Sequence, residues 1–591
     1  MSRDRRTNPP RSRQRGSSYD DSPRIGKRGE IRASSSKRDD SRFRSVMVFA
    51  LLFAAVALIR LLMLHVFDAP LNNERLDARR TSDIVLHSKR GTIYDRNGNV
   101  LAMSLDCSTI TTNPTMVTDA DTAARLCKEI LGGNEETYRT MFAKDSTFEY
   151  VQRRVDNELA QKLLKAFADE GLKGLFLVND TKRVYPYGGV GGQVLGMVGS
   201  DGEGLTGLES YYDDVLKGRD GTMHMEVSAT TGAPIAGSAY EVNDAQDGTD
   251  IMLSIDIDVQ RVAEENIVRA VEDYQAGSGM VMATDPKTGE ILAACSTPLA
   301  DLTSPESLTN DALSLSLVSQ SYEPGSIFKC LTMAIGIENG VLNPNSTYTV
   351  PAVVKAGDDD VRDDDGRDYT MDMSCREILR RSSNTGAILC GQTIGADAFA
   401  QGVSNFGIGT KTGIDYPGEV EGLVVQRDSY SGATLGAMSF GQALAVPMVQ
   451  MVRALGAISN GGTLCTPHFL LRRDGQEVKW DTVGEACSKR SASQVTDMMR
   501  TVVQEGTATA AQVPGYDVAG KTGTGEQSNE HGYVENSYLA SLVGFANADD
   551  AEVLVYVGLN NTPYLAYASA APTFSAIMGE ALLDLGIEPA A

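Results

Sequence analysis

One long apolar segment near the N-terminus constrains the architecture of this chain more than any other feature. The segment covers residues 46–67, and Arg60 is its only Lys, Arg, Asp or Glu residue. About 20 apolar residues in a helix are enough to cross the hydrocarbon core of a bilayer. Arg60 lies in the last third of the segment, from which its long side chain can reach the far interface. We therefore predict one membrane-spanning signal anchor over residues 45–67.

The residues before this segment indicate its orientation. Residues 1–44 contain 14 Lys and Arg against six Asp and Glu, a net charge of +8, and are rich in Ser, Arg and Pro. This composition predicts a disordered tail. The alternatives are a cleaved signal peptide and a buried soluble helix, but the basic stretch is too long for a signal peptide and no small-x-small site follows. The basic flank predicts a cytoplasmic N-terminus, a single pass through the cell membrane and an extracytoplasmic chain from residue 68 onward.

The composition of the exported part excludes some classes of function. Without the tail, 40 Lys and Arg stand against 72 Asp and Glu, a net charge of −32. This charge argues against a nucleic-acid binder that neutralises phosphates. The five His residues are scattered, with no pair at metal-ligand spacing, so we predict neither a metal site nor a cofactor. Eight Cys residues leave a disulfide framework and buried free thiols both open.

The exported part divides into two predicted units. Residues 68–248 mix short alternating strands with turns, including a hairpin around Asn97-Gly98, and show helical spacing near 121–131 and 157–170. No obvious chemistry lies there, which is typical of an extended mixed α/β pedestal.

The second predicted unit covers residues 249–591. A strand near 250–256, a helix over 259–274 and a strand pair at 280–283 and 291–294 open it. Strands near 539–546 and 552–559 and a helix near 573–585 end it. This order predicts an α+β domain, an antiparallel sheet covered by helices.

A first candidate for chemistry is the sequence from Ser326 to Lys329, which follows a turn with a proline and begins an apolar helical run. Residues three apart on a helix share a face. A Ser hydroxyl needs an adjacent base to act as a nucleophile, and a Lys in an apolar site can have its pKa lowered enough to serve. The pattern alone is weak, because residues 34–37 in the tail match it too.

Two further motifs follow downstream. Ser382-Ser383-Asn384 lies at an interruption between two helical stretches, and Lys-Thr-Gly occurs at 287–289, 411–413 and 521–523. The first copy lies in a hairpin turn and the second in a loop, so we reject both. Only the copy at 521–523 precedes the final strands, where an edge strand can face a cleft and its glycines let a substrate backbone approach.

The order Ser-x-x-Lys, Ser-x-Asn, Lys-Thr-Gly at 326, 382 and 521 resembles the signature of penicillin-binding proteins and class A β-lactamases. Residues 90–98, 183–186 and 204–209 resemble the N-terminal motifs of class B penicillin-binding proteins. Tyr-Glu-Pro-Gly-Ser before the Lys, and Ser-Ser-Asn in place of Ser-Cys-Asp, are similar to division-specific transpeptidases, although some sporulation-specific relatives share them. The resemblance implies the serine β-lactamase and penicillin-binding transpeptidase fold.

The resemblance also implies a reaction, D,D-transpeptidation of peptidoglycan stem peptides in septal wall synthesis. By analogy, Ser326 attacks the penultimate D-Ala carbonyl and forms an acyl-enzyme, which an amine of a second stem peptide then attacks. Lys329 takes the Ser326 proton, although the identity of this base is disputed in the family. Ser382 relays a proton to the leaving amine. β-Lactams mimic the D-Ala-D-Ala donor and acylate Ser326.

The remaining motif residues are implied to hold the donor peptide. Asn384 hydrogen-bonds the substrate amide, and Lys521 and Thr522 bind the terminal carboxylate. The backbone N–H groups of Thr524 and of the nucleophile form the oxyanion hole. Gly523 lies between these residues in the same strand and is assigned to the substrate-binding set.

Some residues depart from the family's pattern. Gly525 stands where Ala is usual, and Pro447 stands where Thr is common, but neither position carries a catalytic group. The acidic runs at 358–360 and 363–365 are predicted to be a solvated loop, because their spacing is not that of an EF-hand.

Three classes of function stay open at this stage. The leading one is a membrane-anchored class B transpeptidase. A D,D-carboxypeptidase or β-lactamase of the same fold is the second, although a secreted β-lactamase would need neither the anchor nor the module over 68–248. A non-catalytic β-lactam sensor or division scaffold is the third. The predicted partners of a transpeptidase are a polytopic membrane glycosyltransferase and other division proteins.

Overall fold

The structure is a computed structural model that describes residues 36–63, 81–226, 241–304, 306, 308–529 and 532–589. It forms two compact units, Met1–Ser82 with Met225–Ser238 and Asp83–His224 with Ala239–Ala591. Each unit is described by itself.

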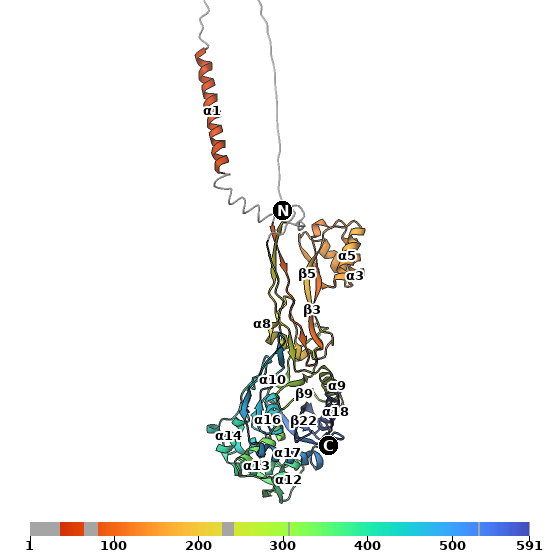
Figure 1. Ribbon diagram of the computed structural model, residues 1–591, viewed down its shortest axis with the longest axis vertical. Coiled ribbons are helices and arrows are strands. Elements are labelled where there is room, and N and C mark those ends of the chain that lie inside the picture. The colour runs from red at the N-terminus through yellow and green to blue at the C-terminus, as the bar shows by residue number, and fades with distance from the viewer. Residues whose placement is uncertain are drawn as a thin grey trace, which may run out of the picture. The chain divides into compact units, whose positions relative to one another are not determined.

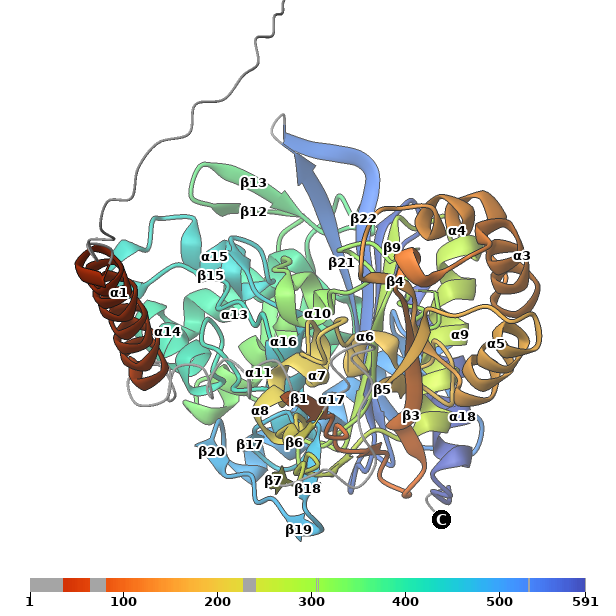
Figure 2. The same ribbon diagram turned by 90° about the horizontal axis from the view of Figure 1, so that it is seen from above.

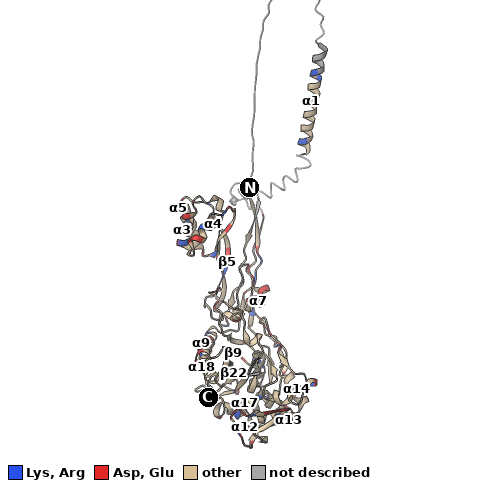
Figure 3. Cartoon of the chain, turned by 180° about the vertical axis from the view of Figure 1, so that it is seen from behind, with Lys and Arg blue, Asp and Glu red and all other residues tan. Residues whose placement is uncertain are grey.

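The first unit contains helix α1 (Ser36–Leu62), of which the stretch Arg42–Leu62 is long and apolar enough to cross a membrane. Its sequence has no Lys, Arg, Asp or Glu between Arg44 and Arg60, and the helix is tan over most of its length in Figure 3. The helix includes residues 36–44, which the sequence assigns to the tail. The rest of that tail, and residues 64–67 of the predicted anchor, lie outside the described residues.

The second unit is built around an antiparallel five-stranded sheet (Figure 1). In sheet order, its strands are β10 (Ile291–Ser296), β9 (Ser278–Thr284), β23 (Leu554–Thr562), β22 (Gly532–Ala546) and β21 (Val518–Asn529). The predicted strand pair and the two predicted C-terminal strands are therefore confirmed. The Lys-Thr-Gly copy at 521–523 lies on β21, at the edge of the sheet.

Helices cover both faces of this sheet (Figure 2). Helices α9 (Ile257–Asp273) and α18 (Ala570–Asp584) pack on one face, whereas α16 (Met448–Ser459) and α17 (Lys489–Glu505) pack on the other. Helix α11 (Lys329–Glu338) packs among α16, α17, α13 (Asn384–Ile394) and α14 (Ala396–Asn405), and all of its residues except the last are buried. The predicted helices over 259–274 and 573–585 are confirmed.

Shorter elements complete the domain beyond α11. Two of them border the Ser-Ser-Asn motif, namely α12 (Cys375–Arg381) and α13 (Asn384–Ile394), and a hairpin of β12 (Val353–Ala356) and β13 (Asp359–Arg362) lies against α13. The others are α10 (Ser316–Ser319), η4 (Gly325–Phe328), β11 (Thr347–Val350), β14 (Met371–Ser374), α14 (Ala396–Asn405), β15 (Leu423–Val424), η5 (Arg427–Ser429), α15 (Thr434–Ser439), β16 (Leu444–Ala445), β17 (Thr463–Cys465), β19 (Gln476–Glu477), β20 (Thr482–Glu485) and η6 (Thr509–Ala511).

The N-terminal part of the unit contains a second core. Strands β2 (Ile93–Tyr94) and β3 (Val100–Thr112) form the hairpin predicted around Asn97-Gly98. Strand β3 also pairs with β4 (Glu149–Val155) and β5 (Leu175–Val184). Helices α3 (Ala120–Leu131), α4 (Glu135–Phe142) and α5 (Asn157–Asp169) pack on these strands around their own apolar cluster. The other elements are β1 (Thr81–Leu86), η2 (Pro114–Met116), α6 (Gly192–Leu195), α7 (Gly207–Tyr211), α8 (Asp213–Leu216), β6 (Gly221–Glu226) and β7 (Glu241–Asn243).

The predicted boundary at residues 248 and 249 lies next to a strand that both parts share. Strand β8 (Ile251–Leu253) pairs in parallel with β2 and antiparallel with β18 (Leu470–Arg473), so one sheet crosses the boundary. Tyr212 Oη also donates to Asp415 Oδ2 at 2.6 Å. These bonds join the pedestal to the domain that follows.

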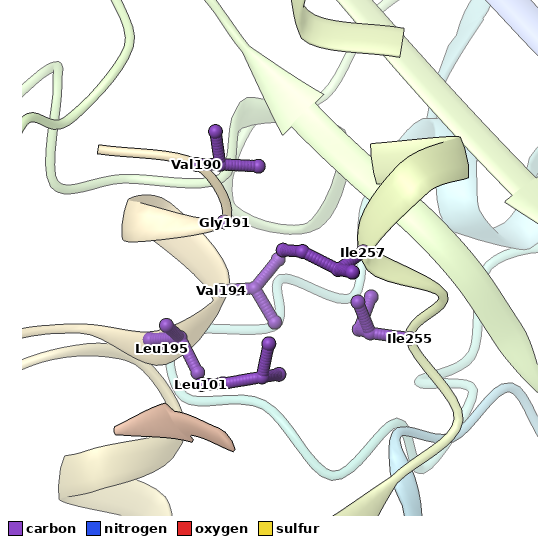
Figure 4. Close-up of a pocket in the computed structure, with 7 residues that line it drawn as sticks. All are labelled: Leu101, Val190, Gly191, Val194, Leu195, Ile255 and Ile257. Atoms are coloured by element: carbon purple, nitrogen blue, oxygen red, sulfur yellow. The ribbon is translucent and has the colours of Figure 1, made fainter. Parts of the chain in front are cut away.

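A small cavity lies at the same junction (Figure 4). Its lining includes Leu101, Val194, Ile255 and Ile257, and no polar side chain contributes to it. A cavity of this composition is a packing feature with no group for catalysis.

The eight cysteines, all in the described part of the chain, are buried free thiols. Of the two possibilities that the sequence leaves open, the structure has the free thiols.

Candidate active site

Ser326 lies in a tight turn at the centre of the domain. The turn is the 3₁₀ helix η4, which continues directly into α11 at Lys329. Gly325 takes a positive φ of 55°, and its N–H donates to the carbonyl of Gly441 at 3.0 Å. A Cβ on Gly441 would lie 2.0 Å from the carbonyl oxygen of Gly325. Glycine at both positions therefore lets this backbone close around Ser326.

The Lys329 side chain is fully buried and reaches back to the turn. Its Nζ lies 2.9 Å from Ser326 Oγ, 2.6 Å from the carbonyl oxygen of Ser382 and 2.7 Å from Asn384 Oδ1. Burial lowers the pKa of Lys329 to about 8, although the negative charges of Asp364 and Asp363 act in the opposite direction. The amine therefore titrates within about one pH unit of neutrality, where an ordinary lysine stays fully charged.

The Ser-Ser-Asn motif forms the junction between two helices, as predicted. Ser382 ends α12 in the left-handed region with φ of 61° and ψ of 36°, a conformation that is uncommon for a residue with a side chain. Ser383 caps α13, since its Oγ accepts the N–H of Gly386 at 3.0 Å. This geometry presents the Ser382 carbonyl and the Asn384 side chain to Lys329.

Lys521 reaches the same place from the edge strand. Its buried Nζ donates to Ser382 Oγ at 2.9 Å and to the carbonyl of Thr522 at 2.7 Å. Burial, and then the nearby charge of Lys329, lower the pKa of Lys521 to about 7. Because Lys329 Nζ also lies 3.3 Å from Ser382 Oγ, this hydroxyl stands between two amines.

The glycines of β21 have different surroundings from those that the sequence suggests. A Cβ on Gly523 would lie 2.6 Å from Ser541 Oγ, 3.0 Å from Ile327 Cγ2 and 3.2 Å from the carbonyl oxygen of Pro324. Gly523 therefore makes room for the nucleophile turn, whereas the sequence predicts that its lack of a side chain lets a substrate backbone approach. A Cβ on Gly525 would lie 3.4 Å from the nearest carbonyl oxygen, so alanine fits there.

The two threonines of this strand flank Gly523. The buried Thr522 hydroxyl lies 2.7 Å from Thr507 Oγ1, and Thr524 is partly buried beside the turn that contains Gly325. The predicted site residues thus come together from η4, α11, α13 and β21. The other two Lys-Thr-Gly copies do not contribute to the site. Lys287 lies in the β9–β10 turn and pairs with Asp550, and residues 411–413 lie in a loop.

Two residues beside the site are not indicated by the sequence. The acidic run 363–365 was predicted to be solvated, but Asp363 is 8% exposed and accepts hydrogen bonds from the neighbours of Asn384. Asp364 Oδ1 accepts from Asn384 Nδ2 at 3.1 Å. Only the β12–β13 hairpin brings these residues to the motif, and no short-range pattern in the sequence indicates that contact.

The arrangement suits acyl transfer. A hydroxyl, a buried amine within hydrogen-bond reach and a backbone turn beside an edge strand are the parts that nucleophilic catalysis through an oxyanion requires. Within the described residues, no group of three or more His, Cys, Asp or Glu side chains is placed to hold a metal ion.

Comparison with known proteins adds independent observations. Residues 279–579 match the model of the penicillin binding protein transpeptidase domain, and residues 85–253 match that of the penicillin-binding protein dimerisation domain. The chain is 31% identical to stage V sporulation protein D of Bacillus subtilis over 85% of its length and 79% of that protein. It is 30% identical to the probable peptidoglycan D,D-transpeptidase PenA of Neisseria gonorrhoeae over 92% of each chain.

A solved structure has the same fold. Penicillin binding protein 3 of Mycobacterium tuberculosis, in complex with aztreonam, superposes with a TM-score of 0.67 at 26% identity, over 86% of this chain and 98% of that one.

Proposed function

The chain belongs to the class B penicillin-binding proteins, and we propose that Ser326 is the nucleophile of its peptidoglycan D,D-transpeptidase reaction. The observation that carries this assignment is the 2.9 Å contact between Ser326 Oγ and the buried Nζ of Lys329. The family is known for transpeptidation of stem peptides and for covalent capture by β-lactams, so one hydroxyl serves both reactions.

Lys329 is the base that takes the Ser326 proton. Two of the groups around its Nζ, the Ser382 carbonyl and Asn384 Oδ1, can only accept hydrogen bonds. A neutral amine has two N–H groups, which these oxygens satisfy, and one lone pair. That lone pair is left for the Ser326 hydroxyl, the only donor among the three nearest groups.

Acylation then forms one bond and breaks another. Ser326 Oγ attacks the penultimate D-Ala carbonyl carbon while its proton passes to Lys329. The backbone N–H groups of Ser326 and Thr524 stabilise the oxyanion. When the intermediate collapses, Ser382 relays a proton to the nitrogen of the terminal D-Ala, which leaves as the free amino acid. An amine of a second stem peptide attacks the ester by the reverse route.

The donor carboxylate is held by Lys521 and Thr522, and Asn384 contacts the peptide amide. A carboxylate near Lys521 favours its protonated form and so raises its pKa from about 7. Donor binding would therefore set the two lysines in different states, with Lys521 charged and Lys329 neutral. Although the two amines are adjacent, Lys521 would then bind the donor carboxylate and Lys329 would accept the Ser326 proton.

The decisive test is labelling with a fluorescent penicillin. Wild type and the matched control Ser321→Ala, an exposed serine before the same turn, are expected to label, and Ser326→Ala is not. Persistent labelling of Ser326→Ala would contradict the nucleophile assignment. Lipid II, a polymerase and the wild-type protein are expected to give cross-linked dimers, whereas purely monomeric tetrapeptide products would favour a D,D-carboxypeptidase.

The cellular setting is a second part of the proposal. Helix α1 has a stretch of suitable length and composition, Arg42–Leu62, and would anchor the chain with residues 68–591 outside the membrane. The division-type motifs support a septal role with a polytopic membrane glycosyltransferase as partner. The similarity to stage V sporulation protein D of Bacillus subtilis supports a role in sporulation as the alternative. Protease treatment of intact cells should spare residues 1–44, and a fluorescent fusion should localise to division sites of vegetative cells.

A further inference from the structure

Two consecutive aspartates on the segment after β13, Asp363 and Asp364, accept hydrogen bonds from the Ser-Ser-Asn motif and the residue that follows it. Asp363 and Asp364 precede Ser382 by a long stretch of chain, and the β12–β13 hairpin packs against α13. The first carboxylate is buried and the second is exposed at the rim of the site. Neither belongs to the three motifs that identify the family.

Asp363 fixes the backbone of the motif. It accepts from the Ser383 hydroxyl at 2.9 Å and from the N–H and hydroxyl of Thr385 at 2.9 and 3.0 Å. Arg367, itself buried, pairs with Asp363 at 3.0 Å and also donates to the Thr385 hydroxyl. Burial raises the pKa of Asp363, but these hydrogen bonds outweigh burial and hold the pKa below its ordinary value. The α12–α13 junction is therefore held from outside by a buried anion.

Asp364 fixes the Asn384 amide. Asn384 Nδ2 donates to Asp364 Oδ1 at 3.1 Å and to the carbonyl of Arg362 at 3.2 Å. With its nitrogen directed there, the amide presents Oδ1 to Lys329. The reverse orientation would place an N–H group against the amine and remove one of the acceptors that occupy its protons. Asp364 and the Arg362 carbonyl together therefore set which end of the amide faces Lys329, and Asp364 is the only one of the two whose side chain makes the contact.

From this geometry we propose that Asp363 and Asp364 are positioning residues for catalysis: Asp363 holds the Ser-Ser-Asn turn, and Asp364 orients Asn384 so that the free electron pair of Lys329 faces Ser326. The inference rests on the proposed function, because it assumes that Lys329 is the base. It adds a role for a segment outside the family's motifs.

The charges agree with the geometry. The groups that act on the pKa of Lys329 are Asp364 and Asp363 from the segment after β13 and Cys330 from its own helix, and Lys329 in turn lowers the pKa of Lys521 on β21. Both aspartates raise the pKa of Lys329 against the effect of burial, and Asp364 also raises that of Lys521. Removing the Asp364 charge should therefore lower the pKa of Lys329 and the pKa of Lys521.

The experiment measures the rate of acylation by a fluorescent penicillin from pH 6 to 10 in Asp364→Asn and Asp364→Ala. Asparagine retains an acceptor for Asn384 and loses the charge, whereas alanine loses both. We expect the rising limb to move to lower pH in both variants, by roughly half a pH unit. The plateau should fall by about tenfold in the alanine variant and change little in the asparagine variant.

Asp365→Asn is the matched control, because Asp365 is the next residue, is also exposed, and lies 3.8 Å from Arg381. It should leave both the midpoint and the plateau unchanged. Melting temperatures of all variants should match wild type, since Asp364 is exposed.

An unchanged midpoint and plateau in both Asp364 variants would overturn the positioning role. A plateau loss with an unmoved midpoint would also overturn it, because that is the result of a purely structural contact. The Ser326→Ala labelling test is independent of these variants, so failure of the proposed function and failure of this inference are distinguishable.

Discussion

Two of the places where the second compact unit buries basic side chains differ in one respect, the pedestal and the active site. In the pedestal, Arg90 and Arg183 enclose the fully buried Glu209, with Arg183 Nε 2.7 Å from its carboxylate, and Arg90 also pairs with Asp213 at 2.6 Å. In the active site, Lys329 and Lys521 are equally buried, yet no ion pair of either lysine is found in the described part of the chain.

The difference separates a structural charge from a reactive one. A buried cation that faces a carboxylate stays charged and holds elements together. A buried amine without a counter-ion has its pKa lowered, here to about 8 and about 7, and becomes able to exchange protons near neutral pH. The comparison predicts that substitutions in the first cluster affect stability, whereas substitutions in the second affect rate.

The largest effect is expected for Lys329→Met. Methionine fills a similar volume without a basic group, so acylation by a fluorescent penicillin should fall by about 10³-fold. The melting temperature should stay equal or rise, because a buried cation has been removed. Lys287→Met, in a rejected copy of the motif, is the control and should alter neither quantity. A melting temperature that falls sharply in Lys329→Met would contradict the assignment of Lys329 as a reactive and not a structural charge.

The converse is expected for Glu209→Gln in the pedestal. Without the carboxylate, Arg90 and Arg183 are buried with insufficient counter-charge, and the free energy of unfolding should fall by about 3–5 kcal/mol. Urea unfolding measures this loss. The acylation rate per folded molecule should stay near the wild-type value, and a rate loss at unchanged stability would contradict the structural assignment.

Gly523→Ala tests whether the nucleophile turn must lie close to β21. The added methyl group would contact Ser541 Oγ, Ile327 and Pro324, at a cost of about 1–3 kcal/mol, and would push Ser326 away from the strand. Gly525→Ala on the same strand is the matched control and should change stability by less than about 0.5 kcal/mol. Equal effects of the two substitutions would show that strand flexibility, rather than this contact, matters.

A further expected effect is a pH dependence of stability. Both lysines have a folded-state pKa below the ordinary value of 10.5, so between about pH 7 and 10.5 the unfolded chain binds more protons than the folded one. The two lysines should therefore make the protein more stable as pH rises through this window. Below it their destabilising effect is constant, because both amines are protonated in the folded and the unfolded chain. The check is the difference in unfolding free energy between wild type and Lys329→Met/Lys521→Met, which should increase with pH and would be flat if the amines titrated normally.

Much of this architecture follows from local sequence. The hairpin at Asn97-Gly98, the helix over 259–274 and the edge strand at 521–523 were predictable, because turn residues and apolar periodicity specify them over short distances. The candidate site was predictable through the order of its three motifs.

Other features depend on tertiary contacts that no local pattern encodes. Asp363 belongs to an acidic run that looks solvated, and only the packing of the β12–β13 hairpin against α13 buries it. Gly523 lies in a glycine-rich strand typical of substrate approach, but the turn that it accommodates comes from a distant part of the chain. The boundary predicted at residues 248 and 249 also depends on tertiary contacts, because β8 pairs with β2 from the pedestal and with β18 from the domain that follows.

The most direct test of the account is the pH dependence of acylation in the wild-type protein. If a buried amine without a counter-ion takes the Ser326 proton, the acylation rate by a fluorescent penicillin should rise with pH and reach half of its plateau near pH 8. The same curve should be absent in Lys329→Met. A wild-type rate that is constant from pH 6 to 10, or that falls over this range, would contradict the claim that Lys329 acts as the base.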